Sequence, residues 1–486
     1  MIRHRSFLKY PLIVFLVMLG SVRLSAEPSK EKPNIILILA DDMGYTDVGC
    51  YGAPKARTPN IDSLAKSGIR FTDSYAAASV CGPSRAGIMT GKYPLLAGFP
   101  TNPWPAHLSN NYKPFGLDSR KQTSMASMLK QAGYATSCIG KWHLGHKKHF
   151  RPGDHGFDEF FGLPHDIGAV PAGQAPLKWF RDNKPVEKAD KDLVTKRCTE
   201  EAVDFINRQP KNPFFIYLSH PMPHTKLGAS PAFKGRSGNG LYCDVIEELD
   251  WSVGQIVEAL KKNGVEKRTV IVFTSDNGPW VNAPGGLFKD GTPRWGSSKP
   301  LKKWKFHWGH EGGSRVPFIV SWPGKIKASR TSHALSSALD LFPTFAELAG
   351  ISIPKAWKIN GTSQLPLWFA DRDDPKGEDA VTKRFFFHST HWAMQGANME
   401  RYHFVKSVSA NHAVSAVREG RWKYVKHTRR RHGKAFEKVN LLFDIQADKE
   451  ENINLYEKHP EIAKRLKIIV DQEQARWKKE YQTIEK

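Results

Sequence analysis

Residues 79–91 bring a thiol and a cation together at a spacing that suits anion binding. Cys81 stands where an irregular Ala/Ser run gives way to a predicted helix, and Pro83 suits the first turn because its missing N–H would be unpaired there. The N-terminus of this helix directs N–H groups and partial positive charge towards Cys81, with Arg85 one turn further on. The segment predicts an anion site beside Cys81, although a lone cysteine is more often a buried structural thiol.

Two apolar runs end in oxygen-bearing side chains. Residues 33–39 lead into Asp41 and Asp42, and residues 269–274 lead into Asp276 and Asn277. Unbroken apolar runs are typical of central strands covered on both faces, and sites in parallel sheets lie beyond the carboxyl ends of the strands. A solvated acidic turn is the alternative, but adjacent carboxylates at a buried strand end favour a cation. A donor set made only of oxygens predicts Ca²⁺, with Mg²⁺ possible, rather than Zn²⁺.

Four further basic side chains follow predicted strands. Lys141 and His143 lie in a glycine-bounded loop from which both side chains can reach one cavity; a surface lysine and a core-edge histidine are the alternative. His220 and His224 share a proline-rich loop, whose rigidity would position a proton donor. Either histidine of this loop is a candidate, and His224 is preferred.

The Cys-x-Pro-Ser-Arg pattern, followed by Ala-Gly-Ile-Met-Thr-Gly, resembles the signature of the type I sulfatases, the arylsulfatase family of the alkaline-phosphatase-like superfamily. Residues 140–145 (Gly-Lys-Trp-His-Leu-Gly) and 311–317 (Glu-Gly-Gly-x-Arg-x-Pro) resemble further segments of that family. The resemblance implies that a maturation enzyme oxidises Cys81 to formylglycine, whose hydrated aldehyde is the nucleophile.

The same resemblance implies a set of site residues. The implied catalytic residues are Cys81, Arg85, Lys141, His143, His224 and Lys305. The implied ligands of one divalent cation are Asp41, Asp42, Cys81, Asp276 and Asn277. Because this chain has one residue more than the usual spacing before Glu311, Lys302 and Lys303 compete with Lys305. Where some relatives place a serine near the sulfate, this chain carries His165.

The resemblance also implies an α/β fold. We expect a large mixed, mostly parallel central sheet flanked by helices, and a smaller C-terminal domain with a short antiparallel sheet and a helix. The predicted segments are a signal peptide (1–26), an N-terminal catalytic domain (27–355) and a C-terminal subdomain (356–486). Residues 168–196 are predicted to be an irregular surface loop. Residues 416–425 and 439–444 are predicted to pair as strands, with a basic turn at 426–434 between them.

The N-terminus and the net charge indicate the compartment and the partners. Basic residues precede a short apolar run at 11–20 and a small residue, Ala26, which is typical of a cleaved secretory signal and too short for a comfortable membrane span. We therefore expect a secreted or periplasmic protein without stable membrane insertion. Loss of four basic residues with the signal lowers the formal charge from +24 to +20. This excess favours a polyanionic partner such as a sulfated glycan, nucleic acid or an anionic surface, and export argues against nucleic acid. The charge alone does not distinguish a sulfated substrate from a solvated basic face.

Two other functions fit parts of this pattern. A phosphomonoester or phosphodiester hydrolase would share the fold, but such enzymes often use Thr or Ser and two metals with additional histidines. A non-catalytic protein that binds sulfated glycans would explain the charge but not the metal ligands. The five cysteines are too few and odd in number for a disulfide framework, although one or two bridges remain open.

Overall fold

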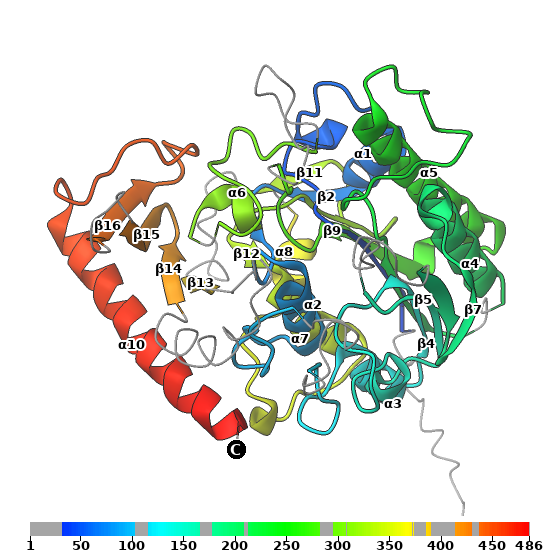
Figure 1. Ribbon diagram of the computed structural model, residues 1–486, viewed down its shortest axis with the longest axis horizontal. Coiled ribbons are helices and arrows are strands. Elements are labelled where there is room, and N and C mark those ends of the chain that lie inside the picture. The colour runs from blue at the N-terminus through cyan, green and yellow to red at the C-terminus, as the bar shows by residue number, and fades with distance from the viewer. Residues whose placement is uncertain are drawn as a thin grey trace, which may run out of the picture. The chain divides into compact units, whose positions relative to one another are not determined.

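A ten-stranded sheet forms the centre of the computed structural model (Figure 1). The structure describes residues 32–102, 115–165, 177–208, 212–281, 295–307, 309–371, 373, 385–389, 414–429 and 437–485, so the expected signal peptide lies outside it. In spatial order the strands are β11 (Arg330–Ser332), β2 (Gly68–Phe71), β10 (Phe318–Ser321), β9 (Thr269–Ser275), β1 (Asn34–Ala40), β8 (Phe214–Ser219), β4 (Ala135–Lys141), β5 (Glu159–Leu163), β6 (Lys178–Arg181) and β7 (Lys184–Lys188).

The middle of this sheet is parallel. Strands β9, β1, β8, β4 and β5 run in one direction, whereas β10 and β6 join them antiparallel on either side. Every residue of β1 and of β9 is buried, as expected for central strands with both faces covered. The mixed, mostly parallel sheet predicted from the sequence is confirmed.

Helices cover both faces of the sheet. Ile35, Leu37 and Leu39 of β1 pack into a core on the side of α2 (Cys81–Thr90), α3 (Met125–Gln131) and α7 (Leu341–Leu348). The alternate residues Ile36 and Ile38 pack into a second core on the side of α1 (Pro59–Lys66), α4 (Val194–Arg208) and α5 (Leu241–Lys262). The period-two alternation of a strand thus divides one apolar run between two cores. Shorter helices are α6 (Glu311–Ser314) and α8 (Leu365–Trp368).

A second, four-stranded antiparallel sheet lies in the C-terminal part of the chain. Its strands are β13 (Phe385–Ser389), β14 (Val414–Glu419), β15 (Trp422–Arg429) and β16 (Glu437–Asp444), and the long helix α10 (Pro460–Glu485) packs along it (Figure 1). A two-stranded parallel pair joins β3 (Ser74–Tyr75), which precedes α2 in the chain, to β12 (Ser336–Ser337). The small antiparallel sheet and terminal helix agree with the prediction.

Two local predictions were wrong. Residues 178–181 and 184–188, expected to be irregular, form the hairpin β6–β7, and α4 begins at Val194; residues 168–176 lie outside the described residues. Residues 416–425, expected to be one strand, contain the turn at Gly420–Arg421 that joins β14 to β15. In both places a short polar turn separates strands whose own sequences are too charged to show a clear apolar pattern.

All five cysteines are free thiols, so no disulfide bond cross-links the fold. Within the described ranges, no helix combines the length and the apolar composition needed to cross a bilayer.

Candidate active site

The carboxylates of the site follow two adjacent parallel strands. The register pairs Ala40 of β1 with Ser275 of β9, so Asp41 and Asp276 emerge side by side. The backbone N–H of Asp276 donates to the carbonyl of Ala40 at 3.0 Å. Asp42 takes a left-handed conformation (φ 69°), and its N–H donates to Asp276 Oδ1 at 3.1 Å. This turn brings three carboxylates to one edge of the sheet, as the strand-end pattern predicted.

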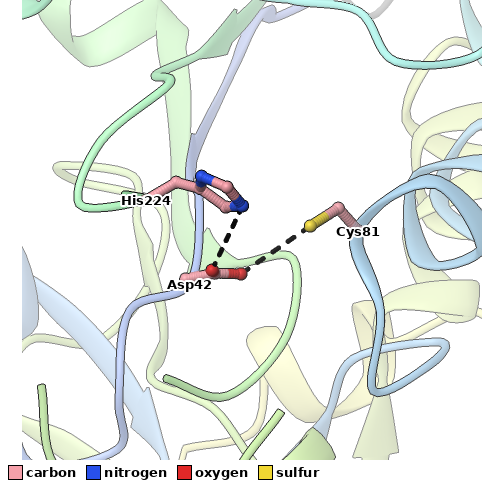
Figure 2. A group of neighbouring side chains, drawn as sticks. All are labelled: Asp42, Cys81 and His224. Carbon is pink, nitrogen blue, oxygen red and sulfur yellow. Dashed lines mark hydrogen bonds and ion pairs between the residues drawn. The ribbon is translucent and has the colours of Figure 1, made fainter. Parts of the chain in front are cut away.

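Cys81 is the first residue of α2 and faces these carboxylates. Its Sγ lies 3.7 Å from Asp42 Oδ1 and 3.0 Å from the Nζ of Lys305 (Figure 2 shows the approach to Asp42). The side chain is 1% exposed, and burial raises the pKa of the thiol well above its ordinary value although Lys141 and Lys305 oppose the shift. The thiol is therefore neutral and poorly suited to act as a nucleophile in its unmodified form.

Arg85 ties the helix to the strand ends. Its Nε donates to Asp276 Oδ2 at 2.9 Å, and its Nη1 donates to the carbonyl of Lys141 at 2.9 Å and to Ser219 Oγ. Burial alone would lower the pKa of Arg85, but neighbouring carboxylates, Asp276 first, raise it above its ordinary value. A buried, permanently charged guanidinium thus fixes α2 relative to β9 and β4.

Two lysines complete the charge balance. Lys141 Nζ lies 2.6 Å from Asp41 Oδ2, and Lys305 Nζ lies 2.6 and 2.8 Å from the two oxygens of Asp42. Burial alone would raise the pKa of Asp41, but the surrounding cations, Lys141 first, hold it well below its ordinary value. Burial alone would lower the pKa of Lys305, but Asp42 raises it. Three carboxylates and three cationic side chains therefore face one another away from water.

The structure separates the competing histidines. His224 Nε2 lies 3.6 Å from Asp42 Oδ2, and the ligand atoms of His224, Asp42 and Cys81 all lie within 4.8 Å of one another (Figure 2). His220 instead lies against α5, where its Nε2 is 3.1 Å from Ser252 Oγ, and burial lowers its pKa to about 3. Of the two, only His224 reaches the carboxylates within the described structure.

The competing lysines are also separated. Lys305 reaches Asp42 and Cys81, as described above. Lys302 Nζ donates to the backbone carbonyl of Glu451 at 2.7 Å, and Lys303 Nζ lies over the ring of Trp304, 5.6 Å from its centre. The extra residue before Glu311 is accommodated in this loop, where Lys303 and Phe306 have positive φ values.

His143 lies two residues beyond Lys141 and is buried, with φ 59°. Its N–H donates to the carbonyl of Pro164 at 3.1 Å, and its ring centre is 6.3 Å from that of His165. The ring of His165 also lies 5.1 Å from that of His146. His165 thus belongs to a group of three neighbouring histidine rings.

The donor set suits a hard cation. Among the described residues, the groups of side chains that could ligate a metal are Asp41, Asp42, Cys81 and Asp276, and Asp42, Cys81 and His224, so they overlap in one site. Two buried oxygens there, Asp41 Oδ1 and Asn277 Oδ1, have no hydrogen-bond partner. Burial, followed by the charge of Asp41, raises the pKa of Asp276 to about 7. A cation would relieve this repulsion and satisfy both oxygens, which fits Ca²⁺ or Mg²⁺.

Two serines that support the site were not predicted. Ser219, at the end of β8, donates to the carbonyl of Lys141 at 2.8 Å and accepts from Arg85. Ser275, at the end of β9, accepts from the N–H of Met43 at 3.0 Å and donates to the carbonyl of Asn277 at 2.8 Å. Their position at the last residue of a buried strand was the available signal, since a hydroxyl there faces the edge that holds the site.

Comparison with known proteins agrees with this fold. A family model described as Sulfatase matches residues 33–351, and one described as N-sulphoglucosamine sulphohydrolase, C-terminal, matches residues 303–476. N-acetylgalactosamine-6-sulfatase from Sus scrofa is 38% identical over 408 residues, covering 80% of this chain and 74% of that protein. Arylsulfatase G from Homo sapiens is 34% identical over 447 residues, covering 81% and 78%.

Solved structures show the same architecture. Ps i-CgsB, determined alone and in complex with k-i-k-neocarrahexaose, has a TM-score of 0.75. In its structure without ligand it is 30% identical and covers 93% of this chain and 94% of that one. A sulfatase from Pseudoalteromonas sp. has a TM-score of 0.74 at 25% identity, covering 93% and 91%. The fold and the site define a hydrolase of sulfuric esters. The chain belongs to the sulfatase family.

Proposed function

We propose that this protein is an exported sulfatase that removes sulfate from carbohydrates, using a formylglycine made from Cys81 and one bound divalent cation. The observation that carries the proposal is the convergence of Cys81 with three carboxylates and three cations in a buried site. A carbohydrate substrate is supported by the similarity to N-acetylgalactosamine-6-sulfatase and to Ps i-CgsB, which has been solved with k-i-k-neocarrahexaose.

The cation would be held by Asp41, Asp42, Asp276, Asn277 and residue 81, through carboxylate and amide oxygens. The unsatisfied oxygens of Asp41 and Asn277 support this assignment. We assign Ca²⁺ because the donors are all oxygen, and Mg²⁺ remains the alternative. When present, the cation would offset negative charge on the sulfate, and the formylglycine would supply its hydrated aldehyde as an oxygen nucleophile.

The side chains of this chain would then share the work of sulfate transfer. Lys141 and Lys305 would bind sulfate oxygens, while Arg85 keeps Asp276 in place to accept the proton of the attacking hydroxyl. His224 or Lys305 would protonate the leaving oxygen. His224 is oriented for this role, since its Nδ1 faces the carbonyl of Thr225 and its Nε2 faces the site. His143 would assist release of the bound sulfate.

We further propose the domain limits and the compartment inferred from the sequence: a signal peptide at 1–26, a catalytic domain at 27–355 and a C-terminal subdomain at 356–486. The end of the Sulfatase family match at residue 351 supports the second boundary. Secretion or export to a periplasm would expose the enzyme to sulfated glycans, and the maturation enzyme that acts on Cys81 is the second expected partner.

Replacement of the nucleophile tests the proposal. Cys81→Ala is expected to fold, because the change removes only one buried sulfur atom, and to release no sulfate from sulfated saccharides, because no hydrated aldehyde can form. Sulfate release and thermal unfolding are measured on the variant, and mass spectrometry of the peptide containing residue 81 detects formylglycine in the active protein. Cys198→Ala, which removes another buried thiol on α4, is the matched control and should keep full activity.

Full sulfatase activity of a protein whose Cys81 remains a thiol would contradict the covalent scheme. Turnover of aryl phosphates in preference to aryl sulfates would favour the phosphohydrolase alternative instead.

A further inference from the structure

Two aromatic side chains border the buried sulfate site. The residues around Cys81 are each 5% exposed or less; they are Asp41, Asp42, Arg85, Lys141, His224, Asp276, Asn277 and Lys305. Trp280 and Phe306, which contact two members of this group, are only half-buried. The organic group of a sulfate ester bound in the site must extend towards solvent, and we expect it to pass these two aromatic rings.

The two rings are arranged around the groups proposed to protonate the leaving oxygen. The ring of Trp280 lies 5.6 Å from that of His224, and Lys305 Nζ lies 5.1 Å from the centre of the Trp280 ring. Phe306 meets Trp280 edge-to-face, with the ring centres 5.4 Å apart and the planes at 89°. Lys305 Nζ is also 5.3 Å from the centre of the Phe306 ring. The leaving group would therefore be released beside two aromatic rings at right angles.

Backbone hydrogen bonds fix the segments that carry Trp280 and Phe306 near the segment that precedes Cys81. Trp280 follows Asn277 by three residues and the last residue of β9 by five. The N–H of Lys305 donates to the carbonyl of Pro279 at 3.0 Å, and the N–H of Phe306 donates to the carbonyl of Ser79 at 3.0 Å. Phe306 is held at φ 69°, a conformation that costs energy for a bulky residue and persists only when its surroundings impose it. The rings are thus fixed before substrate arrives.

We propose that Trp280 and Phe306 form the binding platform for the sugar ring that carries the sulfate ester. The C–H face of a pyranose ring is apolar and packs on an aromatic face, while its hydroxyl groups remain free for water or polar side chains. This inference rests on the proposed function and deepens it, because it assigns the leaving alcohol to a cyclic carbohydrate and names the side chains that bind it.

Equilibrium binding to a variant that cannot turn over substrate tests the platform. In the Cys81→Ala background, affinity is measured by calorimetry for N-acetylgalactosamine 6-sulfate, for sulfated carrageenan oligosaccharides and for inorganic sulfate. Adding Trp280→Ala should weaken binding of the best sulfated sugar about tenfold, because stacking is lost, and leave sulfate binding unchanged. Trp280→Phe keeps a smaller ring, so its affinity for the sulfated sugar should lie between those of the parent protein and Trp280→Ala. Phe306→Leu should also weaken sugar binding.

The control is Trp251→Ala, which removes a half-buried tryptophan of α5 that packs on Phe233. It should change neither affinity. Equal weakening of sugar and sulfate by Trp280→Ala would show that the ring merely supports Lys305 and would overturn the platform. A change of less than twofold for every sugar would do the same. If the matured wild-type protein neither binds nor desulfates any sugar of the panel, the proposed function fails, and the platform fails with it.

Discussion

At the scale of single residues, neighbouring side chains of the same type meet different environments. His220 and His224 are four positions apart on one loop, but His224 faces Asp42 while His220 lies between the sheet and Ser252 of α5. Burial lowers the pKa of His220 to about 3, so its ring stays neutral in the folded protein at ordinary pH. A neutral ring in that position supports the fold, and it has no carboxylate partner with which to carry a proton.

His220 should make stability dependent on pH. The unfolded chain takes up a proton below the ordinary histidine pKa of about 6.5, whereas the folded protein resists until about pH 3. The neutral His220 ring therefore contributes fully to the free energy of unfolding above pH 6.5. This contribution is lost as the pH falls, and the loss is about 2 to 3 kcal/mol at pH 4.5.

Denaturant unfolding of the wild type and of His220→Gln, measured from pH 7.5 to 4.5, checks this prediction. The difference in the free energy of unfolding between the two proteins should shrink towards low pH. A constant difference over that range would contradict it, because other acids titrate in both proteins alike.

At the scale of elements, the position of α2 decides whether the site exists, because this helix carries both Cys81 and Arg85. The helix lies close to its neighbours at Gly87, where a Cβ atom would collide with the Cβ of Ala77 and come within 3.1 Å of Leu339 Cδ2. A glycine within a helix normally weakens it relative to alanine, so its presence here indicates a requirement for close approach.

Gly87→Ala should therefore lower stability, despite its better helix propensity, by about 1 to 3 kcal/mol, the usual range for overpacking. Because α2 must shift, Arg85 loses its fit to Asp276 and sulfate release should fall with it. Thermal unfolding and initial rates are measured together. Gly153→Ala is the control: nothing lies within 4 Å of a Cβ there, and both quantities should stay as in the wild type.

At the scale of the whole chain, buried ion pairs join the C-terminal sheet to the segments that carry the site. Lys423 of β15 contacts Glu311 at 2.7 Å and Glu451 at 3.0 Å, all three side chains being fully buried. Arg418 of β14 pairs with Asp73, eight residues before Cys81. Glu311 begins α6, six residues after Lys305. The small sheet thus holds the segment that leads to Cys81 and the segment that follows Lys305.

Lys423→Met should destabilise the protein by about 3 to 5 kcal/mol, because it leaves Glu311 and Glu451 buried with one cation fewer. Lys426→Met on the same strand removes only the partly exposed pair with Asp471 (2.8 Å) and should cost no more than about 1 kcal/mol. The free energy of unfolding of both variants is measured by chemical denaturation. Equal decreases would contradict the prediction, because they would show that the buried ion pairs stabilise the protein no more than the partly exposed pair.

The sequence alone determined the chemistry and the class of fold. The two buried runs ending in Asp41–Asp42 and Asp276–Asn277 predicted parallel strands and an oxygen-rich edge, because a parallel sheet aligns the carboxyl ends of its strands. The segment around Cys81, by its resemblance to a family, predicted the nucleophile. These inferences depend on local sequence, on the family resemblance and on one general rule of sheet geometry, so no distant contact had to be known.

Tertiary structure decided what depends on where a side chain points. It selected His224 over His220 and Lys305 over Lys302 and Lys303, and it added Ser219 and Trp280. Residues a few positions apart on an irregular loop have no periodicity that fixes their direction, so their neighbours are set by elements far away in sequence. Lys423 and Glu311, and likewise Arg418 and Asp73, are buried partners more than a hundred residues apart for the same reason.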